Sequence, residues 1–168
     1  AYTLFEQTDY PSWLYPVLQG ATTMWERWNS YTIENGFGPV DMNSFNHYAY
    51  GAIGEWMFSH SLGIQRDEDH PAYKHIILQP KVGGDLQYAD GYFESPYGVI
   101  RSGWKKTPSG YQYSVTIPAN TTASLNLQAD DIGAVRVLKG AEGVGPFRSL
   151  KGKVMAELKS GTYEFEVQ

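Results

Sequence analysis

The stretch that decides the fold of the second half of the chain is Tyr111-Gln-Tyr-Ser-Val-Thr-Ile117. Apolar and polar side chains alternate along it, and successive side chains of a β-strand point to opposite faces of a sheet. One face of this segment is therefore expected to be buried and the other to face solvent. Such a strand needs a second layer of structure to cover its apolar face.

Further segments of this kind lie on both sides of this stretch, separated by turn-forming residues such as Gly83-Gly84 and Ser160-Gly161. The expected strands cover residues 75–79, 86–93, 98–105, 111–117, 123–128, 134–138, 154–158 and 163–167. Short strands punctuated in this way are typical of an antiparallel β-sandwich. We predict such a sandwich over residues 71–168.

Residues 1–70 show a helical pattern instead. Within residues 43–62 the apolar side chains recur at spacings of three and four, as on one face of a helix. This stripe consists of Phe45, Tyr48, Ala49, Ala52, Ile53, Trp56 and Met57. A shorter pattern predicts a second helix near residues 13–18, which Pro16 would end or kink. A stripe this wide must be buried against other helices, and the sequence predicts only one other helix. We therefore expect this chain to be a fragment of a longer protein.

The segment Gly20-Ala-Thr-Thr-Met-Trp-Glu-Arg-Trp28 places one carboxylate, Glu26, between two indoles and beside a guanidinium. Aromatic neighbours remove water from a carboxylate, while the cation of Arg27 favours its ionised form. That combination suits a general base. The faces of Trp25 and Trp28 suit stacking against a sugar ring. A structural Glu26–Arg27 ion pair at the edge of an aromatic core explains the same residues, and both interpretations stay open.

Composition narrows the class of function. Lys and Arg total 13 and Asp and Glu total 18, for a net charge of −5, which argues against binding to nucleic acid. There is no cysteine, and no apolar run approaches the ~20 residues of a membrane span. His60, His70 and His75 do not have the spacing of metal ligands. We therefore expect no metal, no cofactor and no membrane span.

Several long motifs, in this order, resemble bacterial α-L-rhamnosidases of glycoside hydrolase family 78. The first is the run from Gly20 to Trp28, and the second is Met42-Asn-Ser-Phe-Asn-His-Tyr-Ala-Tyr-Gly-Ala-Ile-Gly-Glu-Trp56. The resemblance continues through Tyr73-Lys-His-Ile-Ile-Leu-Gln-Pro80, Tyr92-Phe-Glu-Ser-Pro-Tyr-Gly98 and Pro118-Ala-Asn-Thr-Thr122. It implies an α+β composite: residues 1–70 are the last helices of an (α/α)₆ barrel, and residues 71–168 are the β-sandwich that follows.

The resemblance also implies an inverting glycosidase that removes a terminal α-L-rhamnose from glycans or glycosides. The family's base falls on Glu26 and its sugar-contacting histidine on His47, with Trp25, Arg27 and Trp28 in supporting roles at the substrate. Its general acid comes from earlier barrel helices that no stretch here matches. We therefore expect this chain alone to be inactive and to need the rest of its polypeptide. Activity of the chain alone would point to Glu34, Asp41 or Glu55 as the acid. The family occurs inside and outside bacterial cells, so the resemblance implies no compartment.

Three other interpretations remain open at this stage. The β half is a carbohydrate-binding module, for which Glu94, Trp104 and the many tyrosines would line a groove. Alternatively, it is a structural domain that supports a barrel and binds no sugar. The helical half is also compatible with another (α/α)₆ enzyme that acts on a different sugar. The acidic motif of the earlier barrel helices, which is absent from this sequence, would distinguish such an enzyme from a rhamnosidase.

Overall fold

The alternating segment at residues 110–117 forms strand β7 (Gly110–Ile117) at the centre of a five-stranded sheet. The computed structural model describes all of residues 1–168. They divide into two compact units, which we call the N-terminal unit (residues 1–55 and 83–85) and the C-terminal unit (residues 56–82 and 86–168). The boundary between the units falls between Glu55 and Trp56.

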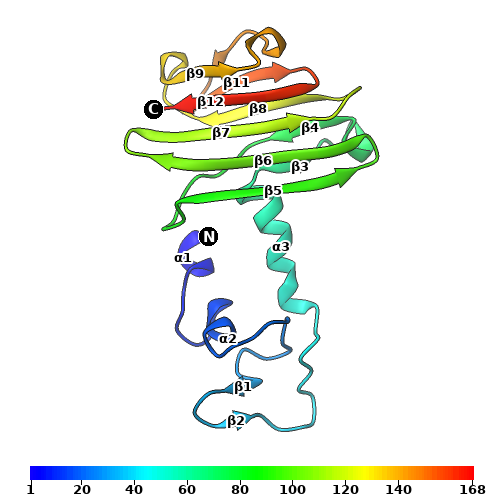
Figure 1. Cartoon of the computed structure of the whole chain (residues 1–168), viewed down its shortest axis with the longest axis vertical. Helices are drawn as coiled ribbons and strands as arrows, with labels where there is room; N and C mark the ends of the chain where they lie inside the picture. Colours follow the sequence, from blue (N-terminus) through cyan, green and yellow to red (C-terminus); the bar gives the residue numbers. More distant parts are fainter. The chain divides into compact units, whose positions relative to one another are not determined.

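The C-terminal unit consists of two stacked five-stranded sheets (Figure 1). The first has the order β5 (Tyr88–Ser95), β6 (Gly98–Thr107), β7, β12 (Gly161–Val167) and β9 (Val135–Lys139). The second has the order β10 (Arg148–Ser149), β11 (Lys153–Leu158), β8 (Thr122–Gln128), β4 (His75–Leu78) and β3 (Ile64–Arg66). The unit also contains η2 (Met57–Ser61) and three short 3₁₀ turns: η3 (Pro71–Tyr73), η4 (Ile132–Ala134) and η5 (Ala141–Gly143). The β-sandwich predicted from the sequence is confirmed.

The core of the C-terminal unit lies between the two sheets. Tyr113, Val115 and Ile117 of β7 are at most 2% exposed, as their alternation predicted. The fully buried apolar side chains also include Ile76, Leu78, Ile100, Leu125, Leu127, Val154 and Phe165, drawn from both sheets. Burying one such side chain contributes about 1.5–3 kcal/mol. The core therefore accounts for the choice of face along each of these strands.

The sandwich is not purely antiparallel, which corrects the prediction. Strands β4 and β8 are parallel neighbours, with His75 opposite Thr122 and Leu78 opposite Leu125. After β4 the chain crosses to the other sheet and forms β5, β6 and β7 as an antiparallel meander before it returns as β8. The two antiparallel pairings within this meander reverse the direction of the chain twice. The return strand β8 runs parallel to β4.

Three buried polar side chains of this core, those of Ser102, Trp104 and Tyr113, are hydrogen-bonded. Ser102 Oγ donates to the carbonyl of Leu62 at 2.6 Å and lies 3.0 Å from Tyr113 Oη, and Trp104 Nε1 donates to the carbonyl of Ser61 at 2.8 Å. Buried polar atoms without such partners would be costly. These bonds attach the end of η2 (Met57–Ser61) and the residue after it to strand β6.

Buried tyrosines predict a loss of stability at alkaline pH. Burial raises the pKa of Tyr111 to about 12 and raises the pKa of Tyr113 as well. The unfolded chain releases these protons near pH 10, so above that pH it binds fewer protons than the folded chain. We expect the urea midpoint to be constant up to about pH 10 and to fall through pH 12. The fall should be shallower in Tyr113→Phe and unchanged in Tyr88→Phe, since Tyr88 is 67% exposed.

The N-terminal unit contains only short elements. They are α1 (Tyr2–Phe5), α2 (Leu14–Leu18), the hairpin strands β1 (Tyr31–Thr32) and β2 (Gly36–Phe37), η1 (Ala49–Ala52) and the beginning of α3 (Ile53–Trp56). The helix predicted near residues 13–18 is present as α2 and includes Pro16. A barrel is not formed by these elements.

Within the helical pattern of residues 43–62 the helical structure begins only at Ala49, so the prediction of a helix is wrong for residues 43–48, which include His47. The backbone before Ala49 forms hydrogen bonds with residues 24–26 and not within a helix: His47 N donates to Met24 O, and Glu26 N donates to Ser44 O, both at 2.8 Å. Backbone groups that are paired across to another segment are not available for a helical turn.

Candidate active site

Two segments of the N-terminal unit lie side by side and bring Glu26 and His47 into one region. Residues 22–26 form neither a helix nor a strand, and bends occur at Thr23 and Glu26. Besides the two backbone bonds just described, Thr23 Oγ1 donates to Phe45 O at 2.5 Å. The motif around Glu26 is therefore bound along its length to the segment that carries His47.

The carboxylate of Glu26 is held by a backbone donor. Ser44 N donates to Glu26 Oε2 at 2.7 Å, while the amide of Glu26 donates back to Ser44 O. The side chain is half-buried, and Oε1 accepts no hydrogen bond from this chain. One oxygen is thus fixed in place and the other is available to a ligand or a water molecule. Ser44 had no role in the sequence prediction, because no local pattern links it to Glu26.

The Glu26–Arg27 ion pair considered from the sequence is not formed. The Arg27 side chain is exposed, and its Nη2 donates to the carbonyl of Asp41 at 3.4 Å. The backbone amide of Arg27 donates to Ser30 Oγ at 3.2 Å, which shapes the turn after the motif. The structural ion-pair interpretation of Glu26 is therefore wrong.

The half-buried imidazole of His47 offers one donor. Its Nδ1 accepts a hydrogen bond from the amide of Ala49 at 3.3 Å, so in the neutral ring the proton resides on Nε2. The ring stacks on that of Tyr48, with centroids 5.5 Å apart and planes at 3°. The arrangement suits a group that donates a hydrogen bond to a hydroxyl.

The tryptophans of the motif pack against neighbouring rings. Trp25 is 6% exposed and lies edge-on to Tyr31 and Phe45, with ring centroids 6.4 and 5.4 Å away. It therefore lacks the stacking face for a sugar that the sequence predicted, and it anchors the segment instead. Trp28 stacks on Tyr50 with centroids 3.6 Å apart.

A hollow of about 350 Å³ lies on the aromatic side of this motif. It is lined by Trp13, Pro16, Val17, Ala21, Thr22, Thr23, Met24, Trp25, Trp28 and Tyr50. Glu26 and His47 do not line it. Its walls are mainly apolar and carry no carboxylate or imidazole, so this hollow is suited to apolar contacts and not to acid–base catalysis.

The other candidate acids do not contact the Glu26 carboxylate. Glu34 lies in the turn between β1 and β2, Asp41 follows β2, and Glu55 is in α3. None of their side chains forms a hydrogen bond or ion pair with Glu26 or Ser44. The region around Ser44 thus presents the carboxylate of Glu26 and the imidazole donor of His47.

Comparison with known proteins relates this geometry to a family. Residues 1–61 match the bacterial alpha-L-rhamnosidase 6 hairpin glycosidase domain, and residues 63–142 match the bacterial alpha-L-rhamnosidase C-terminal domain. The chain belongs to the bacterial α-L-rhamnosidase family. Glu26 and His47 both lie in the part that matches the glycosidase domain, and the change from one match to the other falls between η2 and β3.

Relatives in this family match nearly all of the chain. An α-L-rhamnosidase of Streptomyces avermitilis is 37% identical over 99% of the chain, and one of Formosa agariphila is 39% identical over 98%. The crystal structure of the Streptomyces avermitilis α-L-rhamnosidase with L-rhamnose superposes with a TM-score of 0.87, and that of the Aspergillus terreus enzyme with 0.76 at 34% identity. The chain spans only 16% and 18% of the lengths of the two bacterial relatives, and 16% and 17% of the two crystal structures' chains. No helix of the chain has the length and apolar character needed to cross a membrane.

Proposed function

We propose that this α-L-rhamnosidase chain is the C-terminal part of an inverting enzyme that removes a terminal α-L-rhamnose from glycans or glycosides. The observation that carries the proposal is the reciprocal bonding of Glu26 and Ser44, which fixes a carboxylate beside the segment of His47. The rhamnose-bound relative from Streptomyces avermitilis supports the choice of sugar.

We further propose that the N-terminal unit supplies the last helices of an (α/α)₆ barrel. In this unit Tyr48 is 87% exposed, although it belongs to the apolar stripe predicted from the sequence. A Cβ atom built on Gly51 or Gly54 would meet nothing within 4 Å. Apolar surface of this kind suits contact with other helices of the same polypeptide.

The boundary between barrel and sandwich is proposed at residues 62–63. Strand β3 (Ile64–Arg66) pairs with β4 and so belongs to the second sheet of the sandwich. The boundary at residue 70 expected from the sequence would assign this strand to the barrel. The match to the C-terminal domain begins at residue 63, which supports a boundary at residues 62–63 and not at residue 70.

In the proposed reaction Glu26 acts as the general base. Its Oε2 is held by the amide of Ser44, so Oε1 accepts a proton from a water molecule that attacks the anomeric carbon. An acid on the other side of the sugar protonates the departing oxygen, and the two carboxyl groups of such pairs are ~6.5–9.5 Å apart. His47 Nε2 donates to a sugar hydroxyl, and Trp25, Arg27 and Trp28 support the substrate site by holding the motif in place.

The acid of this reaction is proposed to come from outside the chain, because no stretch of this sequence matches the segment that carries the acid in the family. We therefore expect the chain alone to release no 4-nitrophenol from 4-nitrophenyl α-L-rhamnoside, whereas the whole enzyme that contains it does. Circular dichroism of the chain would establish that it is folded, and 4-nitrophenyl β-D-glucoside would serve as the control substrate. Turnover by the folded chain alone would contradict the external acid.

A further inference from the structure

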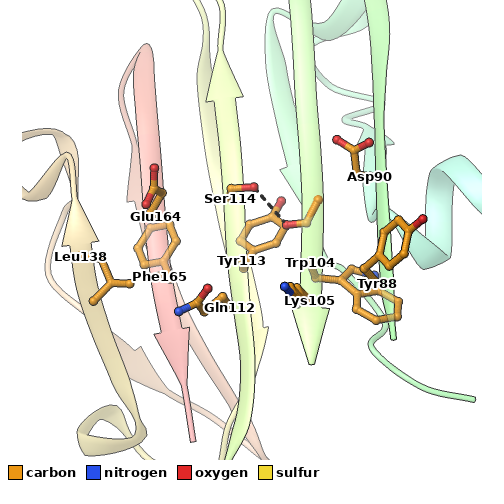
Figure 2. A pocket seen from close by; sticks show the side chains of 11 residues that line it. Tyr88, Asp90, Trp104, Lys105, Gln112, Tyr113, Ser114, Leu138, Glu164 and Phe165 are labelled. Atoms are coloured by element: carbon orange, nitrogen blue, oxygen red, sulfur yellow. Dashed lines mark hydrogen bonds between the residues drawn. The ribbon is translucent and has the colours of Figure 1, made fainter. Parts of the chain in front are cut away.

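A second hollow, of about 510 Å³, lies on the outer face of the sheet β5-β6-β7-β12-β9 (Figure 2). Its floor is a row of residues in register across four strands: Asp90 lies opposite Gly103, Gly103 opposite Ser114, and Ser114 opposite Glu164. Gly103 has no side chain and Ser114 has a short one, so the centre of the sheet is low while its sides are raised. Ligand pockets commonly have volumes of ~300–1,000 Å³.

The walls of this hollow combine an aromatic ring with hydrogen-bonding groups. Tyr88, which is 67% exposed, lies with Asp90 on one side, and Leu138 lies with Glu164 on the other (Figure 2). Lys105 and Gln112 stand opposite each other in the neighbouring row, next to Tyr88. An exposed ring provides a stacking face, and an amide, an ammonium group and carboxylates provide both donors and acceptors.

Most of these polar side chains are available to a ligand. Asp90, Lys105 and Gln112 form no hydrogen bond or ion pair within the chain, while Glu164 lies 3.8 Å from Lys139 and Ser114 Oγ donates weakly to Gly103 O at 3.4 Å. Asp90, Glu164 and Lys105 line the hollow, and Lys139 lies beside Glu164, so the positive and negative charges around it are balanced and give no attraction for an anion. The chemistry that fits is a neutral molecule with many hydroxyls and an apolar C–H face.

We propose that this hollow binds a neutral glycan, at a site separate from Glu26. A sugar ring stacks on Tyr88, while its hydroxyls donate to Asp90 and Glu164 and accept from Lys105 and Gln112. Tyr92 extends the aromatic surface along β5: it is 53% exposed, and the guanidinium of Arg101 lies 5.3 Å from its ring centroid. The proposal assigns binding, and not catalysis, to the sandwich.

The test measures binding of neutral tetrasaccharides of β-1,4-linked xylose, glucose, mannose and galactose to the whole chain. Calorimetry gives the Kd, and amide chemical shifts identify the residues affected. We expect at least one of them to bind with a Kd on the order of 1 mM or tighter, and a galacturonic acid tetrasaccharide to bind more weakly. Leaving out rhamnosides keeps the outcome independent of the proposed rhamnosidase site.

Three variants locate the binding site. Tyr88→Ala should weaken binding about tenfold by removing the stacking face. Ser114→Tyr, which fills the centre of the hollow from a solvent-facing strand position, should abolish it. Tyr97→Ala is the matched control, because this tyrosine is 40% exposed in the turn after β5 and does not line the hollow. No binding of any neutral tetrasaccharide, or binding that survives Ser114→Tyr, would overturn the proposal.

Discussion

Replacing Glu26 by glutamine in the whole rhamnosidase should lower kcat for 4-nitrophenyl α-L-rhamnoside by about 10²–10⁴-fold, the usual contribution of a general base. Glutamine keeps an oxygen that accepts the hydrogen bond from Ser44 N, so the local backbone should remain in place. Its amide cannot take a proton from water. Steady-state kinetics of the purified variant measures this loss.

Binding separates a chemical role of Glu26 from a structural one. The variant should still bind L-rhamnose with nearly the Kd of the unchanged enzyme, measured by calorimetry. Glu34→Gln, an exposed carboxylate in the turn between β1 and β2, is the matched control and should keep full turnover. Near-normal kcat in Glu26→Gln would remove this residue from the role of base.

A large loss of stability is expected from Gly63→Ala. Gly63 has a φ of +73°, and an added Cβ would lie 2.2 Å from the nitrogen of Pro80 and 2.3 Å from the carbonyl carbon of Gln79. Both atoms belong to the backbone, so no side-chain rotation relieves the contact. The carbonyl of Gly63 also accepts from Gln79 N at 2.9 Å, which ties the residue before β3 to the end of β4.

Gly152 provides the matched control, since it has the same φ of +73° but nothing within 4 Å of an added Cβ. Gly152→Ala should cost about 1–2 kcal/mol, the strain of a left-handed backbone alone. Gly63→Ala should cost about 1–3 kcal/mol more, because the backbone must move. Urea denaturation of both variants measures the difference. Equal losses would show that the contact with Pro80 is relieved without cost.

The strands of the sandwich could be predicted because their signal is local. The alternation of Tyr113, Val115 and Ile117 with polar neighbours marks one buried face, and the eight predicted strands all occur within a few residues of their expected positions. Strands β3 (Ile64–Arg66) and β10 (Arg148–Ser149) were missed because segments this short are too brief to show a period. The parallel pairing of β4 with β8 has no local signal, since it depends on how many strands the chain forms in the other sheet.

In the candidate site, too, local motifs could be predicted from the sequence, whereas contacts between distant residues could not. The residue types at Glu26 and His47 were recognisable from the motifs around them, and the structure brings their segments together. The partner that orients Glu26 is a backbone amide, that of Ser44, and a backbone donor carries no signature in the sequence. The burial of Trp25 and the stacking of Trp28 on Tyr50 likewise depend on rings distant in sequence.

The sequence by itself determined the β class of the second half, the positions of its main strands, the family motifs and the residue types available for chemistry. Each of these depends on neighbouring residues or on runs of them. Only the tertiary structure decided which groups meet: the register that aligns Gly103 with Ser114 to form the outer hollow, and the pairing of residues 24–26 with residues 44–47 in place of a first helical turn. Such contacts join segments far apart in the chain, and their free energy comes from packing and hydrogen bonds that no local pattern encodes.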